Sequence, residues 1–391
     1  FGELLRARLA RGAGAEGMAD LHRRAAAWYA EQGQIDDAIR HALAGNDAST
    51  AARLVAAIPV EVLWQAGSVG AIRRWVDDLP VAALLAHPRA ALIGAVAHLL
   101  VGDIAATSRY VALTEDSAEV DAERKLLQAI FARNEGRMDV ALDLLHAAHQ
   151  ELRPDQWLTK SIADLQIVVA HLENGELAQS GALLREMKRC LKRNSQAGMT
   201  LMVQTTAFEC MLSSLQGDLS GAKRIGREAV AVVQESGHIV PIVGQVHAVL
   251  AGIAYLQNDL DEAQAELDRA LHWGERTGIT DILFNAYDTQ IKLHCARGER
   301  EQALAGLQRL RTLYEGTGFA DIISVGRAEE AAIHLRLGNL AQAMRWADEA
   351  GHDLSDPLPP RSQSIYYILA SVYLAAARIE RDSSRLERIL D

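Results

Sequence analysis

The sequence contains few of the residues that interrupt helices and few of those that build large aromatic cores. Only eight prolines and 5% aromatic residues occur among its 391 residues, whereas 49% of the chain is hydrophobic, mostly Ala, Leu, Val and Ile. This balance favours close packing of helices over a β-sandwich or barrel. No stretch keeps the apolar–polar alternation of a strand long enough to pair. The sequence therefore predicts an all-α protein.

Cysteine and positive charge are also scarce. Cys190, Cys210 and Cys295 lie far apart and form no Cys-x-x-Cys pair, which argues against a disulfide framework and a zinc site. The formal net charge of −11 disfavours binding to a phosphate backbone. The richest basic run, residues 185–193, is typical of a solvated helix face. We expect no direct contact with nucleic acid.

The chain has no uninterrupted apolar run of membrane-spanning length and no signal peptide. We therefore expect a cytoplasmic protein that makes no membrane contact. Residue 1 is Phe, and residues 1–9 have the character of a helix already under way. We expect the chain to be a segment of a longer protein.

A short phrase recurs along the chain: Gly, a polar residue, usually an apolar residue, two variable residues and usually a small one. From Gly102 to Gly338 the spacings between copies are 34, 39, 42, 41, 40 and 40 residues. The gap of 69 residues before Gly102 has room for two units, and a weaker echo follows at Ala377. The clear copies begin at Gly33, Gly102, Gly136, Gly175, Gly217, Asn258, Gly298 and Gly338.

The repeated phrase is typical of a tight turn between two antiparallel helices. Gly can end a helix in the left-handed conformation, and the Asp or Asn beside it can cap the next helix. Units of this length resemble the tetratricopeptide repeat, whose basic period is about 34 residues. Such hairpins stack because each cannot bury its apolar face alone. We predict a tetratricopeptide-like helical-hairpin solenoid, a right-handed superhelix whose concave groove is lined mainly by the first helix of each hairpin.

The N-terminal part resembles a known family. Residues 21–29, Leu-His-Arg-Arg-Ala-Ala-Ala-Trp-Tyr, and residues 33–43, Gly-Gln-Ile-Asp-Asp-Ala-Ile-Arg-His-Ala-Leu, are similar to those of the MalT-like regulators, ATP-dependent transcriptional activators of the LuxR class. Residues 75–80, 87–89 and 365–375 follow in the order that this family shows. Ser371 stands where an Arg is expected. The resemblance covers essentially the whole chain.

The resemblance implies a domain organisation. Family members have a nucleotide-binding switch, a winged helix, a helical-repeat sensor and a C-terminal helix-turn-helix. The sequence has no Gly-Lys pair for a Walker A loop, so the resemblance implies the sensor alone. We expect residues 1–16 to be the end of a winged-helix-like module or a linker helix. Residues 17–90 would form N-terminal hairpins, and residues 91–391 the repeats of the sensor.

The resemblance also implies a function. The sensor would bind a small-molecule inducer in its concave groove and control activation of the full-length regulator. It implies ATP only for a nucleotide-binding domain outside this segment, so we expect no cofactor here. Self-association of the full-length protein and a regulatory protein partner are further expectations. The competing hypothesis is a tetratricopeptide scaffold that binds a peptide or a helix of a partner protein.

Neither catalysis nor metal binding is indicated. Among thirteen histidines, His146 and His149 lie three residues apart on one expected helix, but no further ligand is evident near them. No Gly-x-Ser-x-Gly nucleophile motif occurs. We expect a non-enzymatic protein without catalytic or metal-ligating residues.

The turn glycines predict which residues face the groove. In tetratricopeptide units these positions lie about thirteen, ten, six and three residues before the turn Gly. Small residues at some of them, such as Gly252, leave room for a ligand or for a neighbouring backbone. The chemistry leaves an anion, a sugar or an aromatic acid open as the inducer. The predicted ligand-binding residues are Gln204, Gln245, Tyr255, Asn285, Asp288, Lys292 and Tyr367.

Overall fold

The computed structural model describes residues 2–59, 63, 68–190, 195–317, 320–350 and 363–380. Every regular element within these ranges is helical, as the sequence predicts. The contacts divide the chain into two compact units, residues 1–100 with 105–124 and residues 101–104 with 125–391. Each unit is described separately. The predicted divisions after residues 16 and 90 stay predictions.

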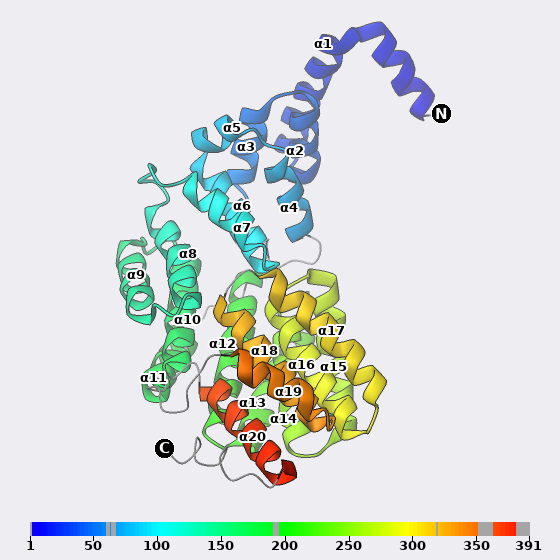
Figure 1. Cartoon of the computed structure of the whole chain (residues 1–391). Helices are drawn as coiled ribbons and strands as arrows, with labels where there is room; N and C mark the ends of the chain where they lie inside the picture. Colours follow the sequence, from blue (N-terminus) through cyan, green and yellow to red (C-terminus); the bar gives the residue numbers. More distant parts are fainter. Residues whose placement is uncertain are drawn as a thin grey trace. The chain divides into compact units, whose positions relative to one another are not determined.

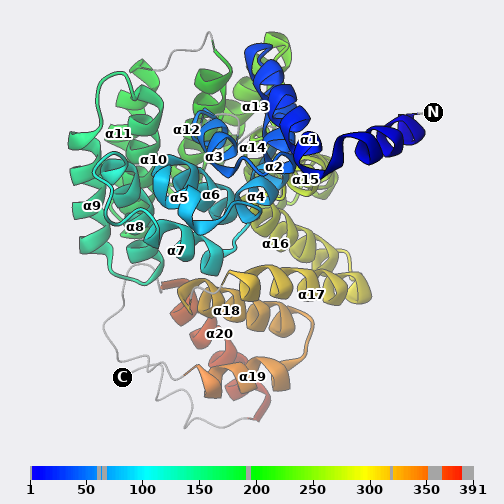
Figure 2. The ribbon, with the colours of Figure 1, turned by 90° about the horizontal axis from the view of Figure 1, so that it is seen from above.

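The first unit consists of short helices packed as hairpins. Its first helix, α1, bends sharply at Gly14, whose φ of 66° is not helical (Figure 2). The helices are α1 (Gly2–Glu31), α2 (Ile35–Ala44), α3 (Ala48–Ala56), α4 (Ser68–Asp77), α5 (Val81–Ala86), α6 (Pro88–Leu100) and α7 (Ile104–Ala112). Helix α8 (Asp121–Asn134) begins in this unit and continues into the second.

Packing explains the residues that carry the family resemblance in this unit. Ala38, Ile39 and Ala42 are fully buried on α2. The Nδ1 atoms of His22 and His41 are 2.8 Å apart, and the His41 ring stacks on Tyr29. Burial, followed by the nearby His22, lowers the pKa of His41. These side chains therefore join α1 to α2.

The second unit is a series of helical hairpins (Figure 1). We call the first helix of each hairpin its A helix and the second its B helix. The A helices are α8, α10 (Trp157–Glu173), α12 (Gln196–Leu215), α14 (Val243–Leu256), α16 (Thr280–Ala296) and α18 (Ala320–Arg336). The B helices are α9 (Met138–Glu151), α11 (Leu177–Cys190), α13 (Leu219–Ser236), α15 (Leu260–Thr277), α17 (Arg300–Gly316) and α19 (Leu340–Glu349). A last helix, α20 (Gln363–Glu380), packs on α18 and α19.

The turns lie where the repeated phrase predicts them. All seven glycines that open the phrase have φ between 71° and 86°, and Asn258 has φ 59°. This left-handed conformation suits Gly because it has no side chain to clash. At two of the turns the neighbouring Asp caps the next helix: Asp218 accepts from the backbone of Gly221, and Asp259 from that of Glu262.

One predicted turn is wrong. Helix α20 runs unbroken through Ala377, where the weaker echo of the phrase predicts a degenerate turn. Ala is the strongest helix former, and no Gly or Pro stands beside it to end the helix. Tyr367 is predicted because it lies ten residues before Ala377. That prediction therefore counts from a turn that does not exist.

The A helices pack against one another from hairpin to hairpin, α12 on α14, α14 on α16 and α16 on α18. Small residues permit this approach, since Ala248, Ala251, Ala254 and Ala286 are almost fully buried in the same cluster. The A helices thus form a continuous surface within this unit. We call its face that carries Tyr255, Asp288 and Lys292 the inner wall.

Candidate ligand-binding site on the inner wall

Charged side chains from two A helices meet on the inner wall. Lys292 Nζ on α16 lies 2.7 Å from Asp288 Oδ2 and 3.8 Å from Glu329 Oε2 on α18. Asp288 and Lys292 lie four residues apart, so both point from the same face of α16. Each of the three side chains is between 20% and 24% exposed. The cluster is therefore partly withdrawn from water but open to a ligand.

Burial and charge act against each other in this cluster. Burial alone would lower the pKa of Lys292, but the carboxylates of Asp288 and Glu329 outweigh it and raise that pKa above its ordinary value. Burial raises the pKa of Glu329, Lys292 opposes that shift, and Asp288 reinforces it. Lys292 is thus held as a cation between two acids.

A hydrogen bond crosses two hairpins beside this cluster. Arg336, at the end of α18, donates to the hydroxyl oxygen of Tyr255 on α14, with an N–O distance of 2.9 Å. The two residues are 81 positions apart, and α16 lies between their helices in the series. The inner wall is therefore curved enough to bring alternate A helices together.

Several acceptor atoms on the inner wall are buried without a donor. Gln204 Oε1 on α12, Gln245 Oε1 on α14 and Asp288 Oδ1 on α16 have no hydrogen-bond partner among the described residues. Buried polar atoms in native proteins are usually satisfied, and leaving one unsatisfied costs about 1–3 kcal/mol. These three acceptors are therefore able to accept hydrogen bonds from another molecule.

The other predicted residues are placed differently. Asn285 is exposed, and its side-chain amide donates to the carbonyl oxygen of Asp281 in its own helix at 2.8 Å. Tyr367 is 76% exposed on α20, and no contact among the described residues links it to the charged cluster. A side chain added at Gly252 would meet only Thr289 Oγ1, at 3.8 Å. No neighbouring backbone lies close enough to Gly252 to require a glycine there. The space beside Gly252 is open instead.

The sequence analysis did not identify Glu329 and Arg336. They lie nine and two residues before the turn at Gly338, one position away from the offsets of ten and three. The offsets themselves give Ala328 and Leu335. Including the residue that follows each of these positions would have found both charges.

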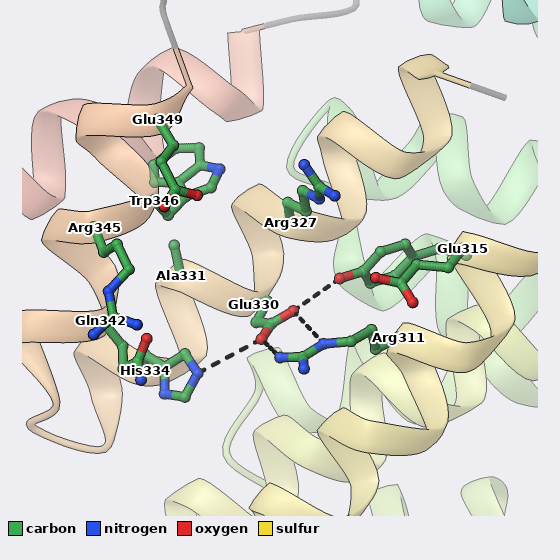
Figure 3. Close-up of a pocket in the computed structure, with 11 residues that line it drawn as sticks. Arg311, Glu315, Arg327, Glu330, Ala331, His334, Gln342, Arg345, Trp346 and Glu349 are labelled. Carbon is green, nitrogen blue, oxygen red and sulfur yellow. Dashed lines mark hydrogen bonds and ion pairs between the residues drawn. The ribbon is translucent and has the colours of Figure 1, made fainter. Parts of the chain in front are cut away.

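A different arrangement of charges occurs in the pocket between α17, α18 and α19, which has a volume of about 200 Å³. Glu330 of α18 is bonded by the Arg311 guanidinium of α17, whose Nε lies 3.1 Å away, and by the Tyr314 hydroxyl at 2.8 Å (Figure 3). His334 Nε2 lies 3.7 Å from the same carboxylate. Glu330 thus joins one hairpin to the next.

Histidine pairs have similar structural roles. His149 Nδ1 lies 2.8 Å from Asp164 of the next hairpin, whereas His146 is exposed. No group of three or more His, Cys, Asp or Glu side chains among the described residues is arranged to hold a metal ion.

No helix in the described part of the chain is long and apolar enough to cross a membrane. Of the basic run 185–193, residues 191–193 lie outside the described ranges, and Lys188 pairs with Glu209.

The hairpins and their curved inner wall define a tetratricopeptide-like helical-repeat domain of the regulatory kind. Residues 122–391 match the family model described as the MalT-like TPR region, and the chain belongs to that family. The family resemblance read from the sequence is thereby confirmed.

A curated relative and a solved structure are also similar to this chain. The serine/threonine-protein kinase PknK of Mycobacterium tuberculosis is 27% identical over 319 residues, and the PknK of Mycobacterium bovis matches equally well. The match covers 78% of this chain but only 28% of PknK. A Rap protein complexed with competence and sporulation factor shares the fold, with a TM-score of 0.50, 11% identity, and coverage of 92% of this chain and 99% of that chain.

Proposed function

We propose that the second unit is the effector-binding sensor of a MalT-like transcriptional regulator and that a polar small molecule binds on its inner wall. The observation that carries this proposal is the set of buried, unpaired acceptors on Gln204, Gln245 and Asp288. A concave surface with a few convergent polar groups is the usual form of a small-molecule site. The domain acts by binding rather than by catalysis.

The chemistry of the inner wall favours a ligand that donates hydrogen bonds. The wall offers free acceptors, whereas Lys292 is already engaged by two carboxylates and Arg336 donates to Tyr255. A ligand that donates a hydrogen bond to Asp288 Oδ1 would pair an acceptor that has no partner among the described residues. A ligand that displaces Arg336 from Tyr255 would change a bond that spans three A helices. Binding would thereby alter the curvature of the repeats, which is a route to control of attached domains.

A screen for thermal stabilisation tests this proposal, because a ligand that binds only the folded state raises its stability. The chain would be screened against sugars, amines, amino acids and organic acids. Asp288→Asn removes a charge with little change of shape and should weaken a hit at least tenfold, since charge-assisted hydrogen bonds contribute about 1.5–3 kcal/mol. Glu228→Gln is the matched control, because Glu228 pairs with Arg224 on the exposed face of α13. Equal loss of affinity in both variants would contradict the assignment of the site.

A peptide ligand is the second candidate, and a row of amides favours it. Gln204, Gln245 and Asn285 each lie thirteen residues before a turn, so successive A helices carry an amide at the same position. A side-chain amide has a donor and an acceptor, as a peptide bond does. The Rap protein with the same fold is complexed with competence and sporulation factor. If the chain is stabilised only by peptides, this second candidate replaces the first.

A further inference from the structure

A separate pocket lies between B helices α13 and α15, with a volume of about 540 Å³. Gly237 ends α13 in the left-handed conformation, with φ 68°, and residues 237–240 of the connection to α14 line the pocket. Its volume lies within the range of small-molecule sites, about 300–1,000 Å³. Apolar side chains dominate its walls: Val230, Val233, Ile239, Val240, Val243 and Trp273.

His247 reaches this pocket from α14, and the pocket is also lined by the polar residues Gln234, His238, Asp268, Arg269 and His272. Its side chain is 6% exposed, and its Nδ1 lies 2.6 Å from Glu266 Oε2. Arg269 bonds the other oxygen of Glu266 at 2.7 Å, so the acid is fully engaged. The bond to Glu266 fixes the orientation of the imidazole. The hydrogen bond of His247 among the described residues is made through Nδ1, so Nε2 is available to a ligand.

The chemistry of His247 selects the polar group of the ligand. With Nδ1 donating to Glu266, Nε2 accepts a hydrogen bond when the ring is neutral and donates one when it is protonated. A hydroxyl group can do both, so it matches either state. A carboxylate would lose much more hydration than a hydroxyl among the apolar side chains. Of the charged residues beside it, Asp268 would repel it, and Arg269 is already bonded to Glu266. Trp273 provides a half-buried ring beside which an aromatic ligand can pack.

We propose that this pocket is a second ligand site, distinct from the inner wall, for a small aromatic molecule with one hydroxyl group, such as a phenol. His247 Nε2 bonds the hydroxyl, and the valines and Trp273 enclose the ring. The pocket of Figure 3 differs, because its central acid is already bonded by Arg311 and Tyr314. Here no hydrogen bond among the described residues engages His247 Nε2, and apolar side chains make up most of the surface around it.

Calorimetric titration of the full chain with p-cresol, toluene and 4-methylbenzoate tests the ligand class. We expect p-cresol to bind about tenfold more tightly than toluene, which is the effect of one net hydrogen bond. We expect 4-methylbenzoate to bind more weakly than either. Equal affinities of p-cresol and toluene would show that His247 does not select the ligand, and tightest binding of the benzoate would overturn the hydroxyl assignment.

Two substitutions on α13 test the location. Val230→Phe fills the pocket from a half-buried wall position and should reduce p-cresol binding at least tenfold. Val232→Phe adds the same ring at a position that is 37% exposed and does not line the pocket, so affinity should be unchanged. Both variants should keep the melting temperature of the unmodified chain to within a few degrees. Unchanged binding in Val230→Phe, or equal losses in both, would overturn the proposal.

Discussion

The inner wall and the joins between hairpins differ in how their charged residues and acceptor atoms are paired. A join is the contact between the B helix of one hairpin and the A helix of the next. Lys188–Glu209 and Arg311–Glu330 occupy the same two repeat positions, thirteen residues after one turn and eight before the next. At these joins the charges are paired with each other. On the inner wall, acceptors of Gln204, Gln245 and Asp288 stay unpaired. The ion pairs at the joins hold neighbouring hairpins together, and the unpaired acceptors support the proposal that the inner wall binds a ligand.

Glycines within the A helices show the same contrast in packing. A Cβ atom at Gly326, on the join side of α18, would lie 2.4 Å from the Tyr314 ring. A Cβ atom at Gly252 would meet only Thr289 Oγ1, at 3.8 Å. Gly326 is therefore required by a neighbouring side chain, whereas Gly252 borders open space. Substitutions at these sites test whether joins and inner wall differ as proposed.

The largest effect is expected for Gly326→Ala. Tyr314 is 1% exposed and bonded to Glu330, so its ring cannot move aside without breaking the join. Overpacking of this kind typically destabilises by about 1–3 kcal/mol, and we expect the upper half of that range. Urea denaturation followed by circular dichroism measures the change. A variant as stable as the unmodified chain would show that the α17–α18 join is loosely packed.

The adjacent residues Glu329 and Glu330 provide a second pair of substitutions, with a smaller expected effect on stability. Glu329 faces the inner wall, and Glu330 faces the join. Glu330→Gln removes the acid that Arg311 and Tyr314 share and should destabilise by about 1–2 kcal/mol, a value reduced because Arg311 is 38% exposed. Glu329→Gln should leave stability nearly unchanged, since burial already disfavours its charge and raises its pKa.

The order of the two variants should be reversed for ligand affinity, which should change more in Glu329→Gln than in Glu330→Gln. Glu329→Gln removes a partner of Lys292 and should alter affinity for an inner-wall ligand, whereas Glu330→Gln should not. Thermal denaturation and calorimetric titration of both variants provide the two measurements. If the two substitutions have equal effects on stability and on binding, the division between inner wall and join is wrong.

The sequence predicts most of the fold because the turns carry its strongest signal. Left-handed backbone at seven turn positions requires Gly, so the period is visible without any structure. The prediction is wrong at Ala377, where neither Gly nor Asn is present. The echo there retained the spacing but not the residue that ends a helix.

The sequence predicts only part of the candidate site. Offsets from the turns selected Tyr255, Asp288 and Lys292, which the structure places in or beside one charged cluster. They missed Arg336 because it lies one position from the offset of three, and the period gives no sign of its bond to Tyr255 across three successive hairpins. They also gave no sign that Asn285 folds back onto Asp281, since rotamers are not encoded in periodicity. The roles of all seven predicted residues in ligand binding stay predictions.

A small change in stability of the opposite sign is expected for Gly252→Ala, the substitution that tests the inner wall most directly. The new methyl group has room, and Ala is favoured over Gly in a helix by about 0.5–1 kcal/mol, so the fold should become more stable. The same methyl group occupies space beside Gln245 and Tyr255 on α14 and should weaken a ligand bound there. Denaturation and titration of one variant therefore give effects of opposite sign. A loss of affinity in a variant that is more stable cannot result from a packing defect, because a packing defect would weaken the fold. A gain in stability without any loss of affinity would place the ligand away from the middle of α14.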